Sequence, residues 1–106
     1  MKTGTLGEFE QALLLAVIRL DDRAYGVTIR REIETRLGRA VAVGALYTSL
    51  GRLERKGLVR SSMSDPTHER GGRSKRFFSI TPAGARALRE CRERFMRMWK
   101  GARVQS

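Results

Sequence analysis

The sequence has very little cysteine or histidine, the residue types that most often hold metals or act as nucleophile and base. Its 106 residues include one cysteine, Cys91, and one histidine, His68. A single cysteine cannot form an internal disulfide, and His68 has no second histidine or cysteine at a metal-ligating spacing. No glycine-rich phosphate-binding motif and no nucleophile with a positioned base is present. We therefore expect no enzyme activity, no catalytic residue, no metal and no cofactor.

Long apolar runs and acidic residues are also scarce. The longest apolar run, residues 12–18, is much shorter than the roughly 20 residues that cross a bilayer. With a lone cysteine, this favours a cytoplasmic location and no membrane partner. The 22 Lys and Arg residues outnumber 11 acids, for a net charge of +11, and residues 54–106 hold 14 of those bases against 5 acids. The electrostatic field of such a positive charge attracts polyanions, and nucleic acid is the first candidate for the binding partner.

Two helices are predicted before residue 40. Apolar residues at helical spacing predict the first over about residues 8–20. Further apolar residues on its flanks predict burial on more than one side; they are Leu14, Leu15 and Ile18. The turn Tyr25-Gly26 opens the second helix, and Gly38 ends it as a C-cap. Its expected apolar positions are Val27, Ile29, Ile33 and Leu37, with the charges of residues 30–36 on the outer face.

A third helix is predicted over residues 43–56, with Gly57 as its cap. Its narrow apolar stripe comprises Val43, Leu46, Leu50 and Leu53, and the residues that fall away from the stripe are Thr48, Ser49, Arg52, Arg55 and Lys56. The members of this outward set that match side chains contacting phosphates and base edges are Thr48, Ser49, Arg52 and Lys56. Tyr47 lies on the flank of the apolar stripe. There it either points its hydroxyl at a phosphate or packs in the core with one edge of its ring exposed to solvent. We favour the phosphate contact.

The hydrophobic period then changes to that of strands. Residues 58–63 and 75–80 predict a hairpin with a long basic tip. Alternation sends Phe78 and Ile80 to the core and Phe77 to the other side, over the base of the hairpin. The cations expected to contact DNA, at phosphates or in the minor groove, are Arg70, Arg73, Lys75 and Arg76.

Thr81 and Pro82 predict the start of a last helix, as an N-cap and a first-turn proline. Large apolar residues gather at its end, where a chain of this size has little core left to receive them. We therefore favour a dimer interface over packing within the chain. The expected interface residues are Leu88, Cys91, Phe95, Met98 and Trp99. A basic helix lying on a membrane surface is the less favoured alternative.

Helix, helix, helix, strand, strand, helix is the element order of a winged helix-turn-helix, which places a helix in the DNA major groove. The expected fold class is mainly α with a two-stranded β wing. We expect residues 1–80 to form the DNA-binding domain and residues 81–106 to form a C-terminal dimerisation helix packed on that domain.

Four blocks of the sequence resemble the PadR family of bacterial transcription regulators, in its short-C-terminus form. They are LGEFEQALLLAVIRL, YGVTIRREIE, GALYTSLGRLERKGLV and GGRSKRFFSITPAG. The last two are the specific ones and are similar to the family patterns GTLYxxLxRLExKGLI and GRPxKYYxLTxxG. The chain departs from these patterns at Ala45, where the family has a small hydroxyl residue, at Ser74, where it has proline, and at two phenylalanines that replace tyrosines.

The resemblance implies a homodimeric repressor that binds a pseudo-palindromic operator in double-stranded DNA. It also implies that the last helix makes much of the dimer contact. Some relatives bind planar aromatic effectors near the dimer interface, so Trp99 is a candidate contact for a small aromatic effector. Plain packing is the commoner role for such a tryptophan.

Two other non-enzymatic functions stay open. A basic RNA- or ribosome-associated winged-helix module would also carry a net charge of +11, although no exposed aromatic pair stands out as a base-stacking platform. Competition between duplex DNA and single-stranded RNA separates this alternative from a DNA regulator. An adaptor that uses its basic surface on an acidic protein would not bind DNA at physiological salt.

Overall fold

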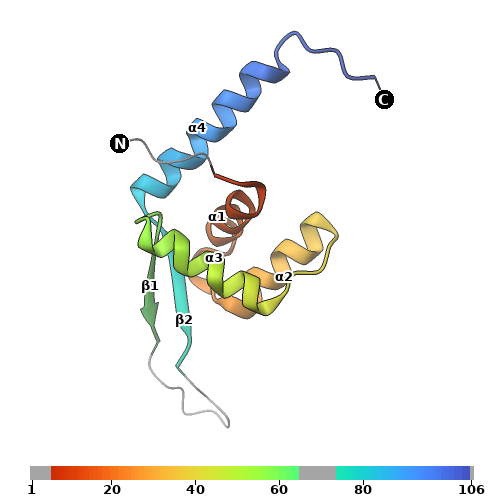
Figure 1. Ribbon diagram of the computed structural model, residues 1–106. Helices are drawn as coiled ribbons and strands as arrows, with labels where there is room; N and C mark the ends of the chain where they lie inside the picture. The colour runs from red at the N-terminus through yellow and green to blue at the C-terminus, as the bar shows by residue number, and fades with distance from the viewer. Residues whose placement is uncertain (1–5, 65–73, 106) are drawn as a thin grey trace.

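The computed structural model describes residues 6–64 and 74–105, which form helices and one two-stranded hairpin (Figure 1). In chain order the elements are α1 (Glu8–Leu20), a short 3-10 turn (Asp21–Arg23), α2 (Gly26–Leu37), α3 (Val43–Arg55), β1 (Val59–Met63), β2 (Arg76–Ile80) and α4 (Pro82–Trp99). The predicted fold class, mainly α with a β wing in a winged helix-turn-helix, is confirmed.

The core lies where α1 meets α2, α3 and the hairpin. Leu13 of α1, Ile29 of α2 and Leu53 of α3 are completely buried and belong to one cluster. Burying each such side chain stabilises the fold by about 1.5–3 kcal/mol relative to leaving it exposed. Phe78 of β2 joins this cluster and Ile80 packs against it, as the alternation in the strand predicted.

Several apolar residues that were predicted to be buried lie outside this core. In α1, Leu15 and Ile18 are 49% and 45% exposed, and in α2, Val27 and Leu37 are 53% and 47% exposed. The prediction that α1 is buried on more than one side is therefore wrong for Leu15 and Ile18. The core packs on the side of α1 that carries Leu13, Leu14 and Val17, whereas α4 borders the opposite flank without covering Leu15 and Ile18.

The hairpin is tied to the connection between α1 and α2. β1 and β2 pair antiparallel, with Val59 opposite Ile80. The Phe78 N–H donates to the Ala24 carbonyl at 2.8 Å. The rings of Tyr25 and Phe77 then pack edge to face, with their centroids 5.3 Å apart. Phe77 thus covers the base of the wing, on the face opposite to Phe78, as predicted.

An ion-pair cluster joins α1 to α2 on the surface. The guanidinium Nε atoms of Arg19 and Arg36 donate to Glu32 Oε2 at 2.8 and 2.9 Å. The hydrogen bond from Arg19, then that from Arg36, lowers the pKa of the Glu32 carboxyl below its ordinary value. A lowered carboxyl pKa means that the cluster stabilises the fold above the ordinary pKa. That contribution is lost as the pH falls through the lowered value.

The start of α4 is fixed by the end of α3 and by β1. Thr81 is the N-cap, as predicted: its Oγ1 accepts from the Gly84 N–H at 3.0 Å and donates to the Gly57 carbonyl at 2.7 Å. Gly84 lies directly against the backbone of Leu58. Beyond Cys91 every residue of α4 is exposed, and the helix extends away from the other elements (Figure 1).

Gly84→Ala is expected to lower the Tm by several degrees. A Cβ at this position would overlap the Leu58 carbonyl and the Ile80 side chain, and overpacking of this kind costs about 1–3 kcal/mol. Thermal unfolding followed by circular dichroism measures the change. Gly44→Ala is the matched control, because a Cβ there meets nothing within 4 Å. An unchanged Tm for Gly84→Ala would contradict the close contact between α4 and Leu58.

Candidate nucleic-acid interface

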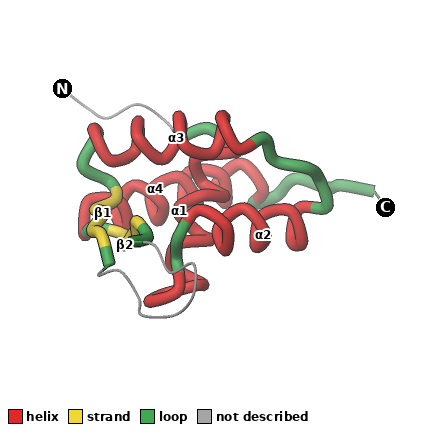
Figure 2. Tube along the Cα trace, turned by 90° about the horizontal axis from the view of Figure 1, so that it is seen from below, coloured by secondary structure: helices red, strands yellow, loops and turns green. Residues whose placement is uncertain are grey.

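α3 lies across the molecule with one face buried and the other exposed (Figure 2). Its first half packs against α2, and its end packs against β1. The buried face carries Leu46, Leu50 and Leu53. Thr48 and Arg52 are exposed, as predicted. Arg55 is exposed as well and lies two turns after Thr48 on the same face. It was not among the expected contact residues.

Ser49 does not belong to the exposed face. It is 8% exposed, so the prediction that it points outward to DNA is wrong. Residues 46, 49, 50 and 53 follow the i, i+3, i+4, i+7 spacing of a single buried helix face. Conversely, Val43 was predicted in the buried stripe and is 48% exposed. The pattern of apolar residues in the sequence therefore predicted burial incorrectly for one residue at each edge of the stripe.

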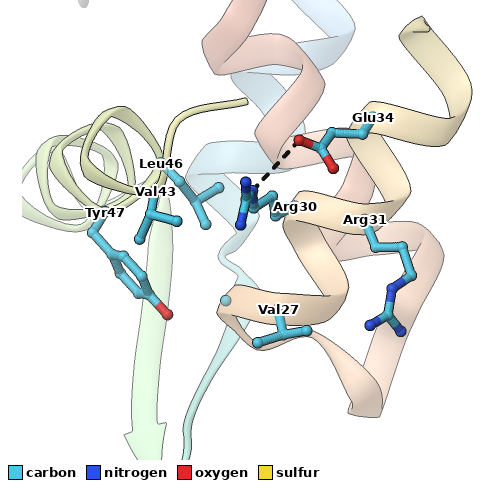
Figure 3. Close-up of a pocket in the computed structure, with 8 residues that line it drawn as sticks. Val27, Arg30, Arg31, Glu34, Val43, Leu46 and Tyr47 are labelled. Atoms are coloured by element: carbon cyan, nitrogen blue, oxygen red, sulfur yellow. Dashed lines mark ion pairs between the residues drawn. The ribbon is translucent and has the colours of Figure 1, made fainter. Parts of the chain in front are cut away.

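Tyr47 joins α3 to the start of α2. Its hydroxyl lies against Gly26, so closely that a Cβ at position 26 would overlap it. The other edge of the ring is open, because Tyr47 is 48% exposed. Tyr47 also borders a cleft of about 280 Å³ between the two helices, which Val27, Arg31 and Val43 help to line (Figure 3). The tyrosine combines packing with an exposed edge, and its phosphate contact stays a prediction.

The turn between α2 and α3 is held by two charged residues of α2. Arg30 Nε donates to the Val41 carbonyl at 2.8 Å, and Glu34 Oε2 accepts from the Val41 N–H at 2.8 Å. The two side chains also pair with each other at 3.4 Å (Figure 3). Val41 is 4% exposed, so its backbone groups need protein partners. Arg30 and Glu34, two of the charges that were predicted on the outer face of α2, thus remain partly exposed while they also hold this turn.

Lys56 follows the last residue of α3 and is directed back to the protein. Its Nζ lies 3.3 Å from Glu10 Oε2 of α1. Lys56 therefore already has a carboxylate partner within the chain, and its contact with DNA stays a prediction. By contrast, within residues 6–64 and 74–105 no carboxylate forms an ion pair with Arg52 or Arg55. The cations that α3 presents to solvent are thus its arginines.

Of the predicted wing cations, Lys75 and Arg76 are described, whereas Arg70 and Arg73 lie outside the described residues. Lys75 Nζ sits over the ring of Tyr25, 5.1 Å from its centroid. Arg76 Nη1 donates to Ser61 Oγ at 3.0 Å, and the Ser61 hydroxyl donates to Glu54 Oε2 at 2.7 Å. Both cations are exposed, and both have one partner at the base of the hairpin.

A second surface feature is an apolar groove of about 900 Å³ between α1 and α4. Leu15 and Ile18 of α1 line it together with Phe95, Met96 and Trp99 of α4.

Three of the predicted interface residues are well exposed: Phe95 (67%), Met98 (75%) and Trp99 (52%). Leu88 is partly buried and Cys91 is buried against the chain's own core. Cys91 therefore has little surface to offer a partner, and the sequence pattern did not identify Leu15 or Ile18 as part of this surface.

The described ranges contain no cluster of His, Cys, Asp or Glu residues arranged to hold a metal ion. His68 lies outside them. Of the helices found in those ranges, none is both long and apolar enough to cross a membrane.

Comparisons with known proteins agree with this geometry. The family model described as "Transcriptional regulator PadR-like family" matches residues 14–90. A PadR-like transcription factor from Bacteroides fragilis has a similar structure, with a TM-score of 0.75 at 21% identity over 87% of this chain and 84% of that chain. A PadR family transcription regulator from Clostridium difficile gives a TM-score of 0.71 at 23% identity, over 87% of this chain and 92% of that one.

The complex structure of hsRosR-SG is also similar, with a TM-score of 0.72 at 29% identity over 92% of this chain and 79% of that chain. The curated proteins gave no match. The solved structures agree on the fold, and the family model covers most of the chain, including α2, α3 and both strands. The chain therefore belongs to the PadR-like family of transcriptional regulators.

Proposed function

We propose that this PadR-like regulator is a cytoplasmic homodimeric repressor that inserts α3 into the major groove of a pseudo-palindromic DNA operator. Residues 1–80 act as the DNA-binding domain, and residues 81–106 provide the dimer contact. The observation that carries the proposal is the exposed face of α3, whose arginines have no acidic partner among the described residues. Repression is the activity expected from the family resemblance.

The DNA contacts come from α3 and the hairpin. Arginine can donate two hydrogen bonds to the major-groove edge of guanine, so Arg52 and Arg55 are the candidates for base recognition. Thr48 is proposed to contact a phosphate or a base edge beside them, and Tyr47 is proposed to contact a phosphate. The hairpin adds phosphate contacts; the residues proposed for it are Arg70, Arg73, Lys75 and Arg76. Lys56 is secondary, since Glu10 already holds its ammonium group.

The partner for the groove between α1 and α4 is a second copy of this chain. The exposed apolar side chains at the end of α4 and those of Leu15 and Ile18 are present on each protomer, and a two-fold axis brings each set onto the other. Such a dimer fixes the distance between its two α3 helices, and hence the spacing of the half-sites. A small aromatic effector near Trp99 would regulate binding by preferring one dimer geometry.

The RNA-binding alternative receives less support from the hairpin. Its aromatic pair, Tyr25 and Phe77, is packed edge to face and partly buried. Single-stranded RNA modules stack bases on open aromatic rings, whereas these two rings pack on each other and Lys75 lies over the ring of Tyr25.

Arg52→Ala and Arg55→Ala are each expected to weaken operator binding about thirtyfold, the middle of the range of about 1–3 kcal/mol for a lost bidentate contact to a base. Binding to unrelated duplex DNA should fall much less, because only the phosphate contribution is shared. Fluorescence anisotropy at one salt concentration measures both affinities, with an operator selected from random DNA. Arg103→Ala is the matched control, since it removes the same charge from the exposed C-terminal tail. Equal losses on both DNAs would make the residue a phosphate contact.

Phe95→Asp is expected to convert a dimer into monomers at micromolar protein concentration, because a carboxylate would be placed in the apolar contact. Sedimentation velocity measures the change. Val104→Asp serves as the control, since Val104 is 68% exposed but lies beyond α4. The proposed dimer contact is refuted if the unmodified protein sediments as a monomer, or if Phe95→Asp remains a dimer.

A further inference from the structure

Val43 is an apolar residue at the start of α3 that the protein leaves without cover. It is the first residue of the helix and is 48% exposed. Val27, the second residue of α2, is 53% exposed on the other side of the cleft between the two helices. Figure 3 shows Val43 and Tyr47 projecting from α3 towards α2, with Val27 on the other side of the gap. Several exposed apolar side chains within one cleft indicate a binding partner more strongly than a single exposed apolar side chain does.

The first turn of α3 has little capacity for hydrogen bonding through side chains. After Val43 come Gly44 and Ala45, both exposed, and Leu46, which is buried. The hydroxyl of Tyr47 is turned back against Gly26. The first outward side chain that can form a hydrogen bond with a base edge is therefore Thr48. In helix-turn-helix proteins, however, the N-terminal residues of the recognition helix are the ones that contact base edges.

A DNA major groove offers only one apolar group to such a surface, the 5-methyl group of thymine. The charges around the cleft favour a nucleic acid over an apolar protein segment. Arg31 lines the cleft and is exposed. Glu34 also lines the cleft but is paired with Arg30, and the chain as a whole carries a net charge of +11. An apolar contact beside an exposed guanidinium group matches a methyl group beside phosphates.

We propose that Val43 is a specificity-determining residue that recognises thymine through contact between its isopropyl group and the thymine 5-methyl group. This assignment rests on the proposed function, since it requires α3 to enter the major groove. Under this proposal, the protein recognises the bases that face the first turn of α3 through contact with a methyl group. It recognises the bases that face Thr48, Arg52 and Arg55 through hydrogen bonds.

The test removes single methyl groups from the DNA. An operator is first selected from a random pool, and each thymine is then replaced in turn by deoxyuridine, which pairs identically but lacks the 5-methyl group. Anisotropy titrations are made with the unmodified protein and with Val43→Ala, Val27→Ala and Val104→Ala. At a thymine in each half-site, methyl removal is expected to weaken binding of the unmodified protein about fourfold, the value of one buried methyl group. Val43→Ala should bind the two DNAs equally, and Val104→Ala should behave like the unmodified protein.

The assignment is overturned if the affinity of Val43→Ala still falls when thymine is replaced by deoxyuridine. It is also overturned if only Val27→Ala becomes insensitive to that replacement, or if no thymine in the operator affects the affinity of the unmodified protein. In those cases the protein still selects an operator, so the proposed function stands. Failure to select any DNA motif would instead overturn the proposed function, and the assignment of Val43 with it. Thermal unfolding of Val43→Ala checks that the variant is folded; its Tm should stay close to that of the unmodified protein, because the side chain is half exposed.

Discussion

The position of α3 relative to α2 depends on the contact between Tyr47 and Gly26. The tyrosine hydroxyl occupies the space that any side chain at position 26 would need, so glycine is required there and the two helices are held at one separation. The ion pair of Arg30 and Glu34 completes this arrangement by binding both backbone groups of Val41 in the turn. With α2 and the turn fixed, the exposed face of α3 keeps one orientation relative to the hairpin. A protein that reads base edges needs such a fixed orientation, since displacement of a recognition helix breaks its hydrogen bonds.

The apolar residues outside the core divide the surface into two functional sides. Leu15, Ile18 and the end of α4 form the groove on one side. Val27, Val43 and Tyr47 border the cleft on the other, beside exposed arginines. The first surface is large and apolar, as expected for a contact between copies of a chain. The second is small and has the exposed guanidinium of Arg31 at its edge, as expected for a contact with nucleic acid.

Most of the fold could be predicted from local sequence signals. The bounds of α1 and α2, the N-cap at Thr81 and the inward position of Phe78 follow from spacing and capping residues, whose effects act over a few residues. Burial at the edges of a helix face could not be predicted in this way. The burial of Ser49 and the exposure of Val43 depend on how α3 is rotated against α2, and the exposure of Leu15 depends on which elements exist to cover it. The roles of Arg30, Glu34 and Lys56 depend on partners that only the tertiary structure brings close.

Selection of bound duplexes from a random DNA pool by the purified protein tests the central claim most directly. The account predicts an enriched motif with two inverted half-sites, because a two-fold dimer presents two identical α3 helices. Their centres should be separated by about 10 base pairs or a multiple of that distance, so that both half-sites face the same side of the DNA. An unenriched pool, or a single half-site without an inverted partner, would contradict recognition of an operator by a homodimer.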